Sequence, residues 1–120
     1  MSARSDLASA LKPHLPKRWM VVRADRPIDE IVVPTLMISQ RTIEPAPNAA
    51  GNHLVTFRLT IMDPHDDENA AEDALDDEVD DLLFALDQVD GLWWTEAQKL
   101  TAQGKRAYQI TLKAASARKE

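Results

Sequence analysis

Residues 53–62 read His-Leu-Val-Thr-Phe-Arg-Leu-Thr-Ile-Met and form the clearest strand signal in the chain. Side chains on a strand alternate between the two faces of a sheet. The residues that share the apolar face here are Val55, Phe57, Leu59 and Ile61. The other face is mostly polar, so the pattern predicts a sheet with one buried face.

A second extended stretch, residues 31–43, precedes this strand. Leu36 and Ile38 would lie on one face, and Pro34 suits the start of a strand. The residues expected on the opposite face are Thr35, Met37 and Ser39. Residues 44–52 are rich in Pro, Asn and Gly, which marks a loop. We therefore predict an antiparallel hairpin with a long loop, preceded by a short strand at residues 19–22.

Two helices are indicated by apolar residues at helical spacing. The first would begin at Ser5, bury a leucine every fourth residue and end at Pro13. Its buried residues would be Leu7, Leu11 and Leu15. The second would open with a capping box formed by Asn69 and Glu72 and stop near Gly91. Its apolar stripe consists of Ala71, Leu75, Val79, Leu82, Leu83 and Leu86.

A second hairpin, residues 92–100 and 106–114, follows around residues 103–105 and would turn Tyr108, Ile110 and Leu112 inward. The expected order is α-β-β-β-α-β-β. We predict an α+β two-layer sandwich with a mainly antiparallel or mixed sheet of four to five strands and two helices. Residues 1–115 would form a single domain, and residues 116–120 a flexible polar tail.

Charge is divided unevenly along the 120 residues, whose net charge is −6. Residues 63–90 hold 13 of the 20 acidic residues and no Lys or Arg, so the rest of the chain has 7 acidic residues against all 14 basic ones. This division permits one copy to bind another through opposite charges, although a solvated helix surface has the same composition. The chain has no cysteine, which excludes disulfides and thiolate sites and fits assembly in a reducing cytoplasm. We expect no signal peptide and no membrane span.

The chain offers few residues for chemistry. Residues 63–68 combine Asp, His and Glu, but the EF-hand pattern would need Gly where Glu68 stands. The three glycines are far apart, so no phosphate-binding loop is expected. We expect the carboxylates of the second helix to lie along one exposed side in similar surroundings, which would not give an acid–base pair. We therefore predict no enzyme, no cofactor and no metal site.

Trp93 and Trp94 are adjacent on an expected strand, so they would face opposite ways. One would join the core, and the other would lie on the outer face as a protein contact. Burial of both side chains, complete or partial, is the alternative.

As a series of features, the chain resembles the small tail terminator, or tail completion, proteins of long-tailed phages, in particular those that infect actinobacteria. The resemblance covers residues 7–114 and includes no catalytic signature. Its segments are Leu15-Pro16, residues 19–22, 33–36, the Pro/Asn/Gly loop, residues 53–64, 71–76, 79–83, 92–97 and 107–112.

The resemblance implies a structural virion protein at the head-proximal end of the tail, assembled in the host cytoplasm. Such a protein forms a homo-oligomeric ring, usually a hexamer, that caps the tail tube, stops its polymerisation and provides the surface where the head docks. Its partners would be further copies of itself, the tail tube protein and a head-to-tail connector or neck protein. No membrane and no sequence-specific nucleic acid would be bound.

Two sets of interface residues follow from these expectations, and Trp94 is a further candidate. The first pairs the acidic helix of one copy with basic residues of the next: Asp73, Asp76, Asp77, Asp80 and Asp81 with Arg41, Arg58 or Arg106. The second assigns the loop to docking on the tube or on a neighbouring subunit: Pro45, Pro47, Asn48, Gly51 and Asn52.

Two alternatives remain. Another head-to-tail connector or neck subunit would have the same size and class. An acidic inhibitor that mimics DNA would use the same carboxylates, but such a decoy should carry negative charge over much of its surface, whereas the remainder of this chain is positive.

Overall fold

The computed structural model describes residues 3–22, 31–45, 52–102 and 104–117. It has two α-helices and a mixed β-sheet, which confirms the predicted α+β class. The elements in chain order are α1 (Ala3–Leu11), the 3₁₀ turn η1 (Lys12–His14), β1 (Met20–Val22), β2 (Thr35–Pro45), β3 (Asn52–Met62), α2 (Glu68–Asp87), β4 (Leu92–Ala102) and β5 (Lys105–Ala117). In the part of the chain described, no helix is long and apolar enough to cross a membrane.

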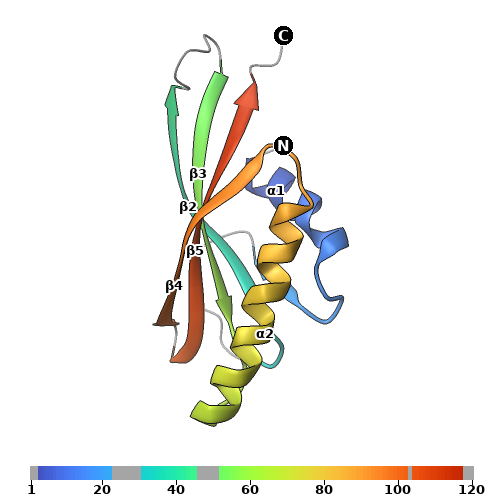
Figure 1. Cartoon of the computed structure of the whole chain (residues 1–120), viewed down its shortest axis with the longest axis vertical. Coiled ribbons are helices and arrows are strands. Elements are labelled where there is room, and N and C mark those ends of the chain that lie inside the picture. Colours follow the sequence, from blue (N-terminus) through green and yellow to red (C-terminus); the bar gives the residue numbers. More distant parts are fainter. Residues whose placement is uncertain (1–2, 23–30, 46–51, 103, 118–120) are drawn as a thin grey trace.

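The sheet has the strand order β1-β2-β3-β5-β4, and both helices lie on the same side of it (Figure 1). β1 pairs with β2 in parallel, and the other neighbours are antiparallel. β1 covers only the first three residues of β2, and β4 begins opposite Ala114 of β5. Beyond these points β2, β3 and β5 continue as a narrow three-stranded extension, which we call the arm. The molecule is elongated as a result, with extents of 50 × 25 × 24 Å.

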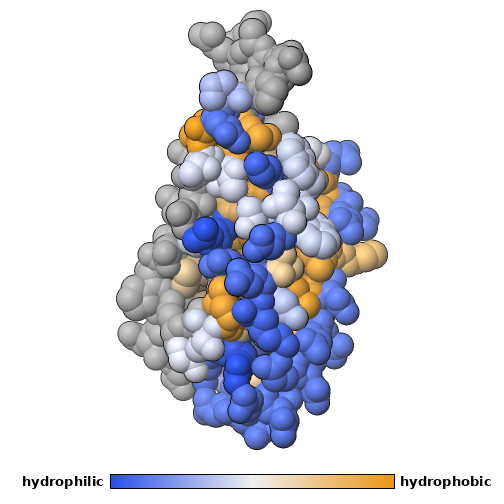
Figure 2. Space-filling model, turned by 60° about the vertical axis from the view of Figure 1, so that its left-hand side comes forward, coloured by the Kyte–Doolittle hydropathy of each residue, from blue (hydrophilic) through white to orange (hydrophobic). Residues whose placement is uncertain are grey.

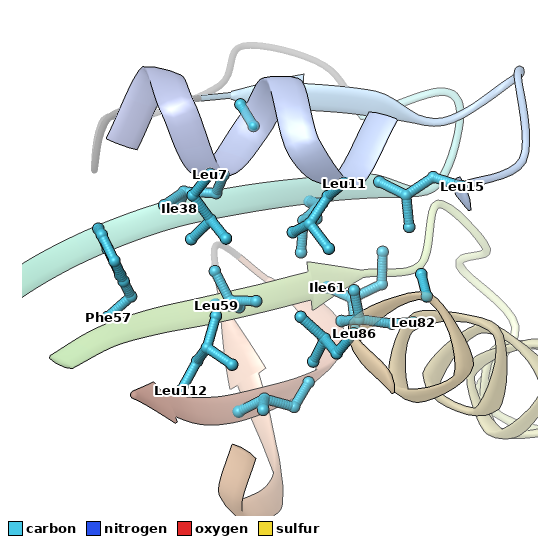
Figure 3. Close-up of a cluster of buried hydrophobic side chains, with 14 of the residues drawn as sticks. Leu7, Leu11, Leu15, Ile38, Phe57, Leu59, Ile61, Leu82, Leu86 and Leu112 are labelled. Carbon is cyan, nitrogen blue, oxygen red and sulfur yellow. The ribbon is translucent and has the colours of Figure 1, made fainter. Parts of the chain in front are cut away.

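One apolar core fills the space between the helices and the sheet. Leu7, Leu11 and Leu15 point down from α1 and the turn after η1, and Leu82 and Leu86 enter from α2 (Figure 3). The sheet contributes the residues that the alternation predicts: Leu36, Ile38, Val55, Phe57, Leu59, Ile61, Ile110 and Leu112. All of these side chains are buried, which confirms the predicted inward faces of the strands.

A second, smaller cluster lies on the opposite face of the sheet. Ile31, Met37, Met62 and Ala107 are buried there, with Leu100 packed against them. The polar side chains of Ser39 and Thr60 are also buried on this face, at 5% and 6% exposure. Part of the sheet face away from the helices is therefore also buried. The polar pattern of residues 53–62 did not indicate this.

Several predicted boundaries were wrong. α1 begins before Ser5, so Ser5 lies inside the helix. The cap of α2 is Asp67, whose carboxylate accepts a hydrogen bond from the Ala70 N–H at 2.9 Å, so the predicted capping box is absent. β5 continues to Ala117, which pairs with Asn52, so residues 116 and 117 belong to the sheet and not to a tail.

Two β-bulges change which residues share a face. The register shifts between Ser39 and Arg41 in β2 and between Trp94 and Glu96 in β4. A bulge adds one residue to one strand only, so side chains beyond it change faces. Ile43 therefore lies on the helix side of the arm, where it is 53% exposed.

We predict that Leu82→Ala lowers the free energy of unfolding by about 2 to 5 kcal/mol, because Leu82 is fully buried and its removal leaves a cavity. Phe84→Ala on the same helix is the matched control, since Phe84 is 66% exposed and should change stability by about 0.5 kcal/mol or less. Urea unfolding followed by circular dichroism measures both. Equal effects of the two substitutions would contradict the placement of α2.

We also predict that Asp67→Ala destabilises the protein by about 0.5 to 2 kcal/mol, because the Ala70 N–H loses its acceptor. Asn69→Ala should leave stability within about 0.5 kcal/mol of the wild type. The same urea titration distinguishes the two residues. A larger effect at Asn69 would restore the capping box that the sequence predicted.

Candidate functional site

The exposed side of α2 carries a row of acidic residues around one aromatic ring. Successive helical residues are turned by about 100°, so Phe84 is turned by about 200° from buried Leu82 and points away from the sheet. The residues that share this direction are Asp73, Asp77, Asp80, Phe84 and Asp87, and we call them the outer ridge. All of them are exposed, as are the other predicted contact residues, Asp76 and Asp81.

The N-terminal half of α2 is bound to the β4–β5 hairpin by ion pairs. Lys99 lies 2.5 Å from Glu72 and 3.7 Å from Asp76. Arg106 pairs with Glu68 and lies 3.7 Å from Glu72. Lys105 pairs with Asp66 and donates to the Pro64 carbonyl at 3.1 Å. The pKa values of Asp66 and Glu72 are lowered, in each case mainly by the hydrogen bond from the lysine.

These pairs change the expected role of Arg106. Arg106 was expected to contact the acidic helix of a neighbouring copy, but in the structure it contacts α2 of its own chain. The acidic helix thus has basic neighbours without a partner protein. Figure 2 shows the resulting surface, whose lower end, where the hairpin and the first turns of α2 lie, is almost uniformly hydrophilic.

The C-terminal half of α2 differs, because its carboxylates have no such neighbours. Among the described residues no Lys or Arg forms an ion pair with Asp77, Asp80, Asp81 or Asp87, nor with Asp73 further back. The last turn of the helix contains no basic residue. The ridge around Phe84 is therefore the part of α2 where negative charge is unbalanced.

The other predicted basic contacts lie elsewhere. Arg58 is exposed on β3, paired in register with Ser39 and Thr111 on the face of the sheet away from the helices. Arg41 lies in β2 directly after the bulge, opposite Phe57, and its side chain is outside the described residues. Arg58 thus lies on the face of the sheet opposite to α2.

The predicted loop lies at the tip of the arm. Pro45 ends β2, is exposed and pairs with His53, and Asn52 begins β3. Pro47, Asn48 and Gly51 lie outside the described residues. The two flanking strands are antiparallel, which confirms the predicted hairpin.

Trp93 and Trp94 face opposite ways, as predicted, but neither joins the core. Trp94 pairs in register with Leu112 on the helix side, and Trp93 pairs with Lys113 on the other side. Their exposed fractions are 39% and 43%. β4 is an edge strand, so both indoles lie near its start at the edge of the sheet, directly before the register shift.

A pair of buried carboxyl groups was not anticipated. Asp63, at the end of β3, is 0% exposed, and Glu78, on the inner side of α2, is 4% exposed. The expectation that all acidic residues of this region lie in similar, exposed surroundings was therefore wrong. A sequence signal exists, since Glu78 falls between Leu75 and Leu82 on the apolar stripe.

Glu78 and Asp63 ionise very differently. Burial, the hydrogen bond to Asp63 and the charge of Asp63 raise the pKa of Glu78 to about 9, with Asp81 adding to this and Arg18 opposing it. Burial raises the pKa of Asp63 as well, but hydrogen bonds from Glu78 and from His65 outweigh it and leave the value below 3.8. At neutral pH, Glu78 is thus protonated and donates to the Asp63 carboxylate. Asp63 Oδ2 and Glu78 Oε2 are both buried acceptors without a donor, and a proton on Glu78 supplies the donor that they lack.

Asp63 also holds the segment that leads into α2. Its Oδ1 accepts from the His65 N–H at 2.9 Å and lies 2.7 Å from His65 Nδ1, and its own N–H donates to the Arg106 carbonyl at 3.1 Å. The Asp63 and His65 side chains thus bind to each other within the segment between β3 and α2. Across the described residues, no group of three or more His, Cys, Asp or Glu residues is arranged to hold a metal ion.

A hollow of about 350 Å³ lies beside η1, and neither Asp63 nor Glu78 lines it. Its lining is Lys12, Pro13, Leu15, Pro16, Lys17, Trp19 and Val21. The walls are mainly apolar, with two lysines, and contain no Ser, Thr, Cys, His or acidic residue. The sequence of this segment predicted core leucines and a short strand at residues 19–22, but it did not indicate a hollow.

No protein-family model matches the chain, and no curated protein matches it.

We predict that Glu78→Gln makes stability less dependent on pH. A pKa raised to about 9 in the folded state, against about 4.5 unfolded, gives stability that is fully present below pH 4.5 and is lost as the pH rises towards 9. Gln cannot ionise but can still donate to Asp63. The advantage of the variant should therefore grow with pH by up to about 1.4 kcal/mol per unit.

Unfolding in urea at pH 5, 7 and 9 measures this effect. Asp63 does not obscure it, because its lowered pKa costs stability only as the pH falls below about 3.8. Asp77→Asn, an exposed carboxyl on the same helix, is the control and should run parallel to the wild type. A difference between Glu78→Gln and the wild type that stays constant across this range would mean that Glu78 is ionised in the folded protein.

Proposed function

We propose that this chain is a structural subunit of a long-tailed phage that acts as a tail terminator: a homo-oligomeric ring that caps the tail tube and offers a docking surface to the head. The observation that carries the proposal is the division of the elongated molecule into a two-layer body and a projecting arm. A subunit with this shape can contact a neighbouring copy through the body and a second protein through the arm.

The arm suits the second of these contacts. Its three strands are joined by continuous pairing from Pro45↔His53 to Asn52↔Ala117, so the tip is presented on a hydrogen-bonded support. Exposed residues follow one another at its end, from Thr42 to Pro45. Ile43, at 53% exposure, gives this part of the surface an apolar contribution. Exposed apolar residues among polar ones are common at protein contacts.

The body suits contacts between copies, because its charges are separated. The outer ridge of α2 is negative, and Lys12, Lys17 and Arg18 are exposed on another segment of the same domain. The buried pair Asp63–Glu78 lies away from solvent, and the hollow contains neither residue. These features favour binding to other proteins over catalysis.

A connector or neck subunit is the alternative within the same class of assembly. It would dock on the head-to-tail joint without stopping tube growth. The ion pairs around the N-terminal end of α2 count against an acidic DNA mimic. Lys99, Lys105 and Arg106 of the same chain neutralise part of the negative charge that such a decoy would use.

A tube-capping assay tests the proposal. The tail tube protein encoded with this chain is polymerised with and without it, and tube lengths are measured in negative-stain images. We expect the wild type to shorten the tubes and to appear as a ring at one end. Unchanged tube lengths, with no density at the ends, would rule out a terminator, and binding to the connector alone would indicate a neck subunit.

We further predict that the tip of the arm is required for capping. Replacing residues 46–52 by Asn-Gly leaves Pro45 and His53 flanking a two-residue turn, which matches their observed pairing. The variant should fold, with an unchanged circular dichroism spectrum, but should fail to shorten tubes. Gln103→Asn, a change between β4 and β5, is the control and should cap normally. Capping by the shortened arm would refute the role of the tip.

A further inference from the structure

The outer ridge of α2 and the hollow beside η1 complement each other in charge and in apolar character, and we infer that the ridge of one copy docks in the hollow of a second copy. This contact would be the subunit interface of the ring and so rests on the proposed function. In a ring, each copy binds one neighbour through its ridge and the other through its hollow, so the contact is head-to-tail.

The ridge presents a single large apolar side chain surrounded by carboxylates. Phe84 is the most exposed large hydrophobic residue among those described, at 66%. Asp80 and Asp81 lie one turn before it and Asp87 one turn after it, within reach of the same contact. An aromatic ring of this kind, central in a patch, is typical of residues that dominate binding.

The hollow has the opposite character. Leu15, Pro16 and Val21 give it an apolar lining, and its volume of about 350 Å³ lies within the range of sites that enclose a bound group. Lys12 and Lys17 also line it, are exposed, and form no ion pair with any described residue. They can therefore pair with the carboxylates on either side of an inserted ring.

Two features of the hollow favour the binding of a partner. Pro13 and Pro16 fix φ at two positions of its wall, so little ordering is needed when a group enters. Trp19 is 7% exposed, yet its indole N–H has no acceptor in the described part of the chain. A buried donor without a partner is costly, so a rearrangement of Trp19 that gave the indole N–H an acceptor would be favoured.

Cross-linking between two single-cysteine variants tests the contact directly, because the chain has no cysteine of its own. Gln88→Cys places a thiol one turn beyond Phe84, and His14→Cys places one beside the hollow; both residues are exposed. The two variants carry tags of different mass and are mixed at high concentration and low salt with a short bismaleimide. Gln98→Cys, exposed on β4, is the control position.

We expect a cross-linked dimer from the mixture of Gln88→Cys and His14→Cys, and none from either variant alone or from mixtures with Gln98→Cys. Adding Phe84→Ala or Lys17→Glu should weaken the association by about ten- to a hundredfold, whereas Val32→Ala, at another exposed apolar side chain, should not. Combining Lys17→Glu in one copy with Asp80→Lys in the other should restore the dimer.

Two results would overturn the inference: no cross-link in the mixture, or cross-links of Gln88→Cys to itself, which would mean that two ridges meet. The capping assay separates this failure from failure of the proposed function. Capping by the wild type without the cross-link would leave the terminator and remove this interface. The cross-link without capping would leave the interface and remove the terminator.

Discussion

The apolar stripe of α2 fixes the rotation of that helix, and the other features of the molecule depend on it. Leu75, Leu82 and Leu86 are at most 1% exposed against the sheet. Burial of each contributes about 1.5 to 3 kcal/mol, whereas each pair of like charges on the exposed side opposes the helix by only about 0.2 to 0.5 kcal/mol. The helix therefore forms in one orientation despite its carboxylates. That orientation turns Phe84 into solvent and Glu78 into the core.

The β4–β5 hairpin then divides α2 into two electrostatic halves. Lys99, Lys105 and Arg106 neutralise carboxylates at the N-terminal end, where the helix dipole already favours negative charge. At the C-terminal end the dipole is negative, the last turn has no basic residue, and Asp87 adds to it. The field is thus strongest around Phe84. A basic partner would therefore be attracted most strongly there. The even spread of carboxylates along the sequence does not reveal this difference.

The sequence was sufficient to predict the elements with strong periodicity and the faces of their strands. The alternation in residues 53–62 and the leucines of α2 confirm this, since burial of apolar side chains decides both. The exact cap of α2 was not predictable, because Asp and Asn are both good N-caps. The conformation of the segment after β3 determines that the helix begins after Asp67 and not after Asn69. The β-bulges after Ser39 and Trp94 were also missed, since no local residue type marks them.

The exposed aspartates of the candidate site were predicted from the sequence, whereas the ion pairs of Arg106 with its own helix were not. The exposed aspartates of α2 follow from the helical period, but the cations that approach them come from a hairpin whose register only the fold determines. Arg106 is bound to its own helix for this reason. Glu78 was missed because charge counting treated every carboxylate alike, although its place among the leucines marks it as buried.

Electrostatics limits how copies of this chain can meet through α2. Two ridges facing each other across a two-fold axis would bring the Asp80 and Asp87 carboxylates of both copies together, and desolvating like charges costs several kcal/mol. Two hollows would place Lys12 and Lys17 against the same residues of the partner. Contact of ridge with hollow avoids both penalties, and it is head-to-tail when each copy uses its two surfaces on different neighbours. Repeated contacts of this kind either close into a ring or continue as a fibre, and the angle between ridge and hollow on one copy decides which.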